Sequence, residues 1–271
     1  MKIAASIFAN SLLSKKGTFL EQVITKQYRQ KDIEKIFTIL KKAGIDGIEL
    51  GIPNNFPLKD LTAVKKILAK NSVKVLSLHQ PIRILSYSSF EEIEKVFQLA
   101  KTFNASRIVF HTDMLSQHLR DVDKIKELKK LEKSYKILAC FENMQFHHVF
   151  FRKKMSWHEE TFQNLMQKHA LHITLDTSHL AQTKKDIISF FKKNKNLIQN
   201  IHISDYKQHP LSASLLGTYL FHLPFGKGNL PIKEFLQTLK SEKYTGNVTI
   251  EVIGTLEQKS ESIQTIKKYV S

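Results

Sequence analysis

Six short apolar runs of this sequence end in residues that can bind a metal ion or move a proton. The closing side chains are imidazoles and carboxylates, which ligate divalent cations and act as general acids or bases. A histidine follows one of these residues by three positions, in the segment LDTSH, and another lies in a long later connection. In chain order, the six closing residues and then these two histidines are His79, His111, Glu142, Asp176, His202, Glu251, His179 and His222.

Each of these residues alone has an ordinary structural explanation, as a hydrogen-bonded histidine or an ion-paired carboxylate. Together they do not, because clustered carboxylates repel one another and are costly to remove from water. None of these runs ends in a lysine or arginine that could neutralise them. A divalent cation would do so, and a mixed His/Asp/Glu set suits Mn, Zn, Fe or Co. The pattern predicts a metal centre, provided that the ends of the runs meet.

The elements that would bring the ends together are eight apolar runs alternating with lysine-rich amphipathic stretches. In one such stretch Ile33, Ile36, Phe37 and Leu40 share a helical face, and Gly44 follows as a C-terminal cap. Eight βα units predict a single (β/α)₈ TIM barrel, whereas a doubly wound open sheet usually has fewer strands. The runs cover residues 2–8, 44–52, 73–80, 106–113, 135–144, 172–180, 198–206 and 247–254.

The alternation inside the last run indicates how the closing residues would be aimed. Val248, Ile250 and Val252 alternate with Thr249 and Glu251, so one face of the strand is aliphatic and the other is polar. In a barrel the polar face lines the interior and leads to the C-terminal mouth, where active sites of this fold lie. No Pro/Gly/Ser-rich linker interrupts the chain, so we expect one domain over residues 1–271.

Composition argues against a membrane-spanning or disulfide-bonded protein and leaves nucleic acid open as a partner. No run is long enough to span a membrane, and the single cysteine excludes an internal disulfide, as in a cytoplasmic protein. We interpret the N-terminal segment KIAASIF as a strand and not as a signal peptide. The net charge of +17 attracts polyanions such as DNA. Only five of the 42 basic residues are arginine, which favours a lysine-rich surface over a dedicated nucleic-acid face.

Four weaker features receive mainly structural interpretations. Glu49 is expected inside the barrel near its mouth, and Cys140 is expected to pack in the interior. The glycines of GKG, residues 226–228, lack the strand context of a phosphate-binding loop. The aromatic and basic segment 144–157 could cover a sugar, stack on bases or pack against the barrel, and the sequence leaves these alternatives open.

The chain resembles the xylose isomerase-like barrel superfamily in its motifs FEN, LDTSH, NIHISD and HLPFGKGNLP, followed by YTGNVTIEV. In the branch of sugar and sugar-phosphate isomerases and epimerases, the resemblance implies one divalent cation, Mn or Mg, held by Glu142, Asp176, His202 and Glu251. It also implies that His179 contacts the substrate. Glu142 and Glu251 would remove and return a proton, while the ion stabilises an enediolate of a small sugar or sugar phosphate.

A related branch, the endonuclease IV-like abasic-site nucleases, is the alternative. Its three zinc ions use further histidines, which His79, His111 and His222 resemble. An aspartate two residues before the last of these is replaced here by Leu220, which weakens the match for one ion. DNA would be the partner under this alternative. A barrel that binds sugar without turnover is a third hypothesis, which the intact ligand set disfavours, and barrels of this kind often pair as homo-oligomers.

Overall fold

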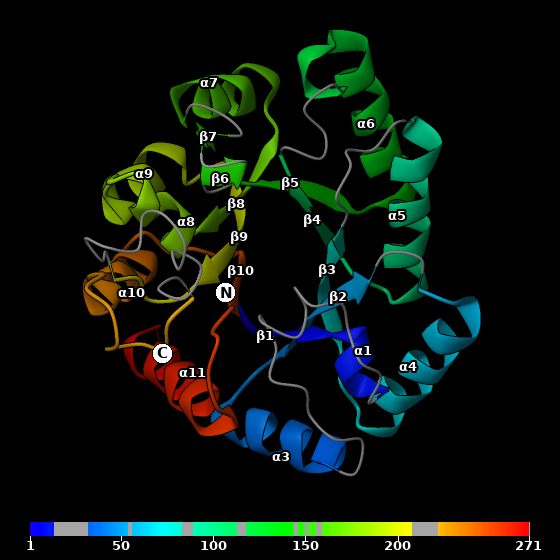
Figure 1. Cartoon of the computed structure of the whole chain (residues 1–271), viewed down its shortest axis with the longest axis vertical. Helices are drawn as coiled ribbons and strands as arrows, with labels where there is room; N and C mark the ends of the chain where they lie inside the picture. Colours follow the sequence, from blue (N-terminus) through cyan, green and yellow to red (C-terminus); the bar gives the residue numbers. More distant parts are fainter. Residues whose placement is uncertain are drawn as a thin grey trace.

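In the computed structural model, eight parallel strands close into a barrel with the order β1-β10-β9-β8-β5-β4-β3-β2, surrounded by helices (Figure 1). Each predicted run supplies one strand, so the predicted (β/α)₈ barrel is confirmed. The structure describes residues 1–13, 32–53, 56–82, 89–112, 118–143, 146–149, 152–155, 159–207 and 222–270. The barrel strands are β1 (Lys2–Phe8), β2 (Gly47–Pro53), β3 (Val75–Ile82), β4 (Arg107–His111), β5 (Leu138–Glu142), β8 (His172–Asp176), β9 (Ile198–Ile203) and β10 (Asn247–Ile250).

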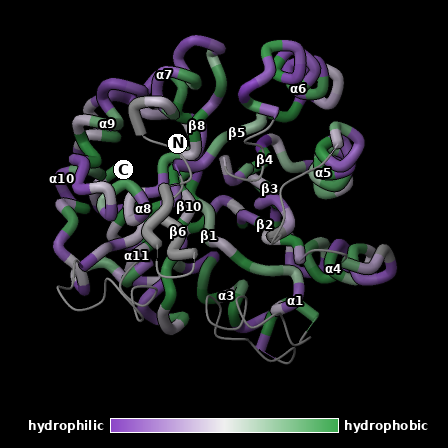
Figure 2. The backbone as a smooth tube through the Cα atoms, turned by 45° about the horizontal axis from the view of Figure 1, so that its top comes forward, coloured by the Kyte–Doolittle hydropathy of each residue, from purple (hydrophilic) through white to green (hydrophobic). Residues whose placement is uncertain are grey.

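The helices cover the outside of the barrel with one apolar face each. In the first long helix the four apolar residues named above are buried as predicted, and Gly44 ends the helix with a φ of +105°. In Figure 2 the tube of the outer helices alternates between hydrophobic and hydrophilic residues, as expected for amphipathic helices. The helices are α1 (Ala9–Leu12), α3 (Ile33–Ala43), α4 (Leu58–Lys70), α5 (Phe90–Thr102), η2 (His118–Arg120), α6 (Val122–Tyr135), α7 (Glu159–His169), α8 (Thr177–Gln182), α9 (Ile187–Asn194), α10 (Ile232–Ser241) and α11 (Leu256–Val270).

The two faces of the strands differ in chemistry as the alternation predicts. Isoleucines, leucines and valines on the outer face form the core between strands and helices. Polar side chains fill the interior, where Asn200 on β9 reaches Glu49 on β2, two strands that are not neighbours in the barrel. Fully buried polar side chains on the strands include Glu49, Ser77, Thr174, Asn200, His202 and Thr249. The interior is therefore a polar column that leads to the mouth.

Three details differ from the sequence-based expectation. The third strand continues past His79 to Ile82, and the last strand ends one residue before Glu251. Within segment 144–157 the structure has an antiparallel pair of short strands, β6 (Phe146–Val149) and β7 (Arg152–Met155). The side chains of this segment lie outside the described part of the structure, so its role stays open. Among the described residues, no helix combines the length and apolar character of a membrane span.

Candidate metal centre

Asp176, the aspartate of LDTSH, has two different tasks at the end of β8. Its Oδ1 accepts hydrogen bonds from the backbone N–H of His179 (2.7 Å) and the hydroxyl of Ser178 (2.9 Å), which makes it the N-cap of α8. Asn143 fixes its backbone with two further hydrogen bonds. Its Oδ2 makes no hydrogen bond with the described residues. The cap therefore holds the carboxylate rigidly while leaving one oxygen available.

That oxygen belongs to a group of four ligand atoms from four neighbouring strands or strand ends, all within 4.8 Å of one another. Nδ1 of His202 lies 2.7 Å from Oε2 of Glu251, 3.7 Å from Oε1 of Glu142 and 4.0 Å from Oδ2 of Asp176. Glu251 is partly exposed and the other three residues are buried. The four residues predicted as metal ligands thus meet at the mouth of the barrel.

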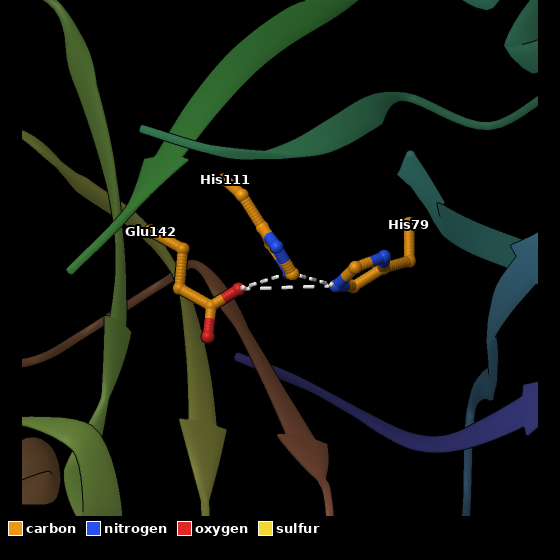
Figure 3. Close-up of side chains that lie close together, drawn as sticks. All are labelled: His79, His111 and Glu142. Atoms are coloured by element: carbon orange, nitrogen blue, oxygen red, sulfur yellow. Dashed lines mark hydrogen bonds and ion pairs between the residues drawn. The ribbon is translucent and has the colours of Figure 1, made fainter. Parts of the chain in front are cut away.

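The other four predicted residues flank this group on two sides. His79 and His111 point from β3 and β4 toward Oε2 of Glu142, at 3.8 and 3.5 Å, as Figure 3 shows. His179 and His222 lie beside Asp176, each with a ring nitrogen 3.9 Å from one of its oxygens. Each flanking set shares a carboxylate with the central group, so all eight predicted residues form one connected cluster.

The charges of the cluster stabilise one another. Burial alone would raise the pKa of Glu142, but His202, His179 and His79 hold it well below the usual value. The pKa of Glu251 is also lowered, because His202 and His222 outweigh its burial. In return, Glu49, Glu251 and Glu142 raise the pKa of His202 well above the usual value despite its burial. Asp176 and Glu142 likewise raise the pKa of His179 to about 9.

A divalent cation fits the central group on two observations. The donors are three carboxylates and one imidazole, a set that Mn, Mg and Zn all accept to different degrees. Three atoms of this group, Oδ2 of Asp176, Oε2 of Glu251 and Nδ1 of His202, are buried and make no hydrogen bond with the described residues. Buried polar atoms are normally satisfied, so three converging ones indicate a missing partner that accepts electron pairs.

Two charged residues beside the cluster interact with its members, which the sequence did not indicate. Glu49, expected to be structural, has Oε1 2.8 Å from Nε2 of His202. Lys259, in the first turns of α11, is half-buried and attracted by Glu251, and burial lowers its pKa to about 8. None of the runs ends in a lysine or arginine, but Lys259 places a positive charge beside the cluster from the helix that follows the last strand. The capping box of Thr255 and Gln258, which marks that helix start, could have directed attention to it.

Two structural interpretations are confirmed. Cys140 is fully buried, and burial raises the pKa of its thiol to about 12, so it is not a nucleophile. In the loop that contains GKG, the backbone N–H groups of Gly226, Gly228 and Leu230 donate to the carboxylate of Asp205 at 2.9 to 3.0 Å. A phosphate would have to compete with this internal carboxylate, so the loop is not a phosphate site.

Comparison with known proteins agrees with this fold. The sequence profile of the family described as Xylose isomerase-like TIM barrel matches residues 37–269. An uncharacterized protein of Mycobacterium leprae (strain TN) is 25% identical in an alignment of 242 residues that covers 81% of this chain and 83% of that protein.

Solved structures share the fold at lower sequence identity. A D-tagatose 3-epimerase-like protein superposes with a TM-score of 0.66 and 19% identity, covering 100% of this chain and 97% of the other. A D-allulose 3-epimerase from Methylomonas sp. gives a TM-score of 0.66 and 13% identity, covering 100% and 96%. At these identities the likeness establishes the fold and leaves the substrate to other evidence.

Proposed function

This chain belongs to the xylose isomerase-like TIM barrel family, and on that premise we propose that it is a divalent-metal-dependent isomerase or epimerase of a small sugar or sugar phosphate. The observation that carries the proposal is the convergence of Glu142, Asp176, His202 and Glu251 at the barrel mouth. The epimerases among the structural neighbours support the same class of reaction. We also propose that residues 1–271 form a single barrel domain.

In this proposal the four residues hold Mn or Mg, and the bound ion supplies positive charge that polarises the carbonyl and hydroxyl oxygens of a sugar. The chain's own part is to move the proton. Glu142 and Glu251 have lowered pKa values and are ionised at neutral pH, so either can accept a proton from the carbon beside the carbonyl. They come from β5 and the end of β10, two strands separated by β8 and β9. One carboxylate would remove the proton and the other would return it.

The flanking histidines would orient the sugar. His179 lies 2.9 Å from Oε1 of Glu142 through Nδ1, close enough to hold that carboxylate in position and to meet a substrate hydroxyl beside it. His79 and His111 lie near the other oxygen of the same carboxylate, Oε2. Imidazoles donate and accept hydrogen bonds, which suits the hydroxyls of a sugar.

Solvent isotope exchange tests the proposal. Ketoses are incubated with the manganese-loaded protein in D₂O, and deuterium at the carbon beside the carbonyl is followed by NMR. We expect incorporation by the wild type and its loss in Glu142→Gln and Glu251→Gln. Glu94→Gln serves as the control, because that carboxylate lies on α5 and accepts a hydrogen bond from Tyr135. Equal exchange in both active-site variants and the wild type would refute the two-carboxylate reaction.

An abasic-site endonuclease is the second candidate, and one observation favours it. Two further sets of potential ligands, His79–His111–Glu142 and Asp176–His179–His222, flank the central group, as three neighbouring ions would require. The net charge of +17 would also favour DNA. Leu220, where that branch has an aspartate, lies outside the described residues. An oligonucleotide with one abasic site tests this candidate: nicking that EDTA abolishes supports it, and an intact oligonucleotide after incubation with zinc-loaded protein rules it out.

A further inference from the structure

A buried carboxylate faces the side of His202 that points away from the proposed metal ligands. Glu49 lies on β2 and is fully buried. Its Oε1 is 2.8 Å from Nε2 of His202, within ion-pair distance, although neither atom makes a hydrogen bond with the described residues. Glu49 belongs to none of the three groups of potential metal ligands found among the described residues. Its contact is therefore with the ligand and not with the ion site.

Glu49 is held in place from two other strands. Its second oxygen, Oε2, accepts a hydrogen bond from the hydroxyl of Ser77 on β3 (2.7 Å). The same oxygen accepts one from Nδ2 of Asn200 on β9 (3.2 Å), and Thr249 on β10 donates to Oδ1 of that amide (3.4 Å). With one oxygen fixed by two donors, the other cannot turn away from His202. The contact is thus built by four strands of the barrel.

The two ring nitrogens of His202 face opposite sets of carboxylates. Nδ1 points to the group of Glu142, Asp176 and Glu251, and Nε2 points to Glu49. A neutral imidazole that binds a cation through one nitrogen carries its proton on the other. That N–H normally requires an acceptor, and a carboxylate is a strong one because it also orients the ring and raises the basicity of the ligand nitrogen.

We propose that Glu49 is the positioning residue of the metal centre: it holds the proton of His202 on Nε2 and thereby presents Nδ1 to the divalent cation. The inference rests on the proposed metal centre but not on the substrate or the reaction. It extends the site to β2, a strand that contributes no ligand. It also adds a buried carboxylate to a site whose ligands already include three carboxylates, which increases the attraction for a dication.

Calorimetric titration of metal-free protein with Mn²⁺ tests this inference without any turnover. We expect Glu49→Gln to weaken binding about 10- to 100-fold, as found for other residues that orient metal ligands. Ser77→Ala keeps the carboxylate but removes one of its anchors, so its loss should be smaller. Glu132→Gln is the matched control, because it makes the same change in a carboxylate outside the cluster, whose Oε1 accepts a hydrogen bond from the backbone N–H of Ala139 (2.7 Å). We expect it to bind like the wild type.

The outcomes separate this inference from the proposed function. Wild-type affinity in Glu49→Gln, or an equal loss in Glu132→Gln, would overturn the role of Glu49 while leaving the metal centre intact. Manganese binding that depends on Glu49, in a protein without sugar turnover, would support this inference and count against the isomerase. A wild type that binds no Mn²⁺ would overturn both.

Nitrogen-15 NMR of the zinc-loaded wild type gives a second test that does not depend on a variant folding. Zinc is diamagnetic, so the histidine ring nitrogens can be assigned through their protons. We expect His202 to carry its proton on Nε2 with Nδ1 bound to zinc. A proton on Nδ1, with Nε2 bound to zinc, would overturn the inference.

Discussion

Two buried aspartates follow neighbouring strands of the barrel, and they are used in opposite ways. Asp205, two residues after β9, directs both carboxylate oxygens at backbone N–H groups. Four of these donate to it at 2.8 to 3.0 Å, from Tyr206, Gly226, Gly228 and Leu230. Asp176, at the end of β8, uses only one oxygen in this way and leaves the other facing His202.

The difference distinguishes a structural carboxylate from one available for chemistry. Asp176 and Asp205 are both buried, with 0% and 1% of their surface exposed, so neither burial nor residue type distinguishes them. What separates them is whether backbone donors saturate the oxygens. A saturated carboxylate closes a loop, whereas a half-saturated one beside other unsatisfied ligand atoms can bind a cation.

The largest predicted effects come from replacing Asp176 and Asp205, one at a time, with asparagine. Asp176→Asn should weaken Mn²⁺ binding at least about 100-fold, because it removes a ligand. Its stability without metal should fall less than that of Asp205→Asn, because asparagine also caps helices well and only the attraction between Asp176 and His179 is lost. Asp205→Asn should cost about 3 kcal/mol of unfolding free energy, because its hydrogen bonds from the backbone are charge-assisted.

Urea unfolding and calorimetric titration of both variants measure these effects. If Asp176→Asn unfolded as readily as Asp205→Asn and retained its metal affinity, the distinction between the two carboxylates would be wrong. A reversed pattern, with Asp205→Asn losing metal and keeping stability, would place the cation in the loop instead.

Titration within the cluster around Asp176 should make stability depend on pH. The pKa of His179 is raised from 6.5 to about 9, so its contribution to the stability of metal-free protein is complete below about pH 6.5 and disappears as the pH rises through about 9. Metal affinity should change in the opposite direction, by up to about tenfold per pH unit for each proton displaced.

Thermal unfolding in EDTA at about pH 6 and about pH 9.5 tests this prediction, and His179→Gln should flatten the difference. The loss of melting temperature between these pH values should be larger in the wild type than in His179→Gln. An equal or smaller loss would contradict the sign of the shift, because Lys259, whose lowered pKa of about 8 acts in the opposite direction, is present in both proteins.

The glycines of the Asp205 loop offer a smaller, purely structural effect. A Cβ on Gly228 would lie 2.3 Å from Oδ1 of Asp205, so Gly228→Ala should disrupt the loop and cost about 2 kcal/mol. A Cβ on Gly226 would meet nothing within 4 Å, although its φ is +79°, so Gly226→Ala should cost only about 1 kcal/mol. Chemical denaturation of the pair, with metal affinity as the control, would be expected to rank them in this order. A smaller cost for Gly228→Ala than for Gly226→Ala would mean that the positive φ of Gly226 outweighs the close approach at Gly228.

The smallest predicted effect concerns the reactivity of Cys140. Its thiolate receives less stabilisation from nearby positive charges than the carboxylate of Glu142 does. Its pKa of about 12 keeps the thiol neutral, so DTNB should label the folded protein far more slowly than the unfolded chain. Fast labelling of the native protein would mean that the interior opens more readily than its packing indicates.

The barrel and the members of the cluster were predictable because local patterns determine both. Alternation in NVTIEV assigns Val248 and Thr249 to opposite faces, and a parallel barrel then brings every strand end to one mouth. Helix α3 was equally readable from its apolar spacing and its glycine cap. These features depend on neighbours a few residues away.

The supporting contacts were not predictable because they join residues far apart in the chain. Glu49 meets Asn200 across 151 positions, and no local pattern indicates that pairing. Lys259 reaches the site from the helix after the last strand, which a search of strand ends alone does not include. The cap function of Asp176 was visible in sequence only as a carboxylate before TSH, without the information that one oxygen stays unused.

The central claim is that one divalent cation binds between Glu142, Asp176, His202 and Glu251. The most direct test is a crystal structure of the manganese-loaded protein with anomalous diffraction data collected for manganese. The account predicts an anomalous peak bonded to Nδ1 of His202 and to one oxygen of each of the three carboxylates. A map without a peak between these four residues, or with manganese bound only elsewhere, would contradict it.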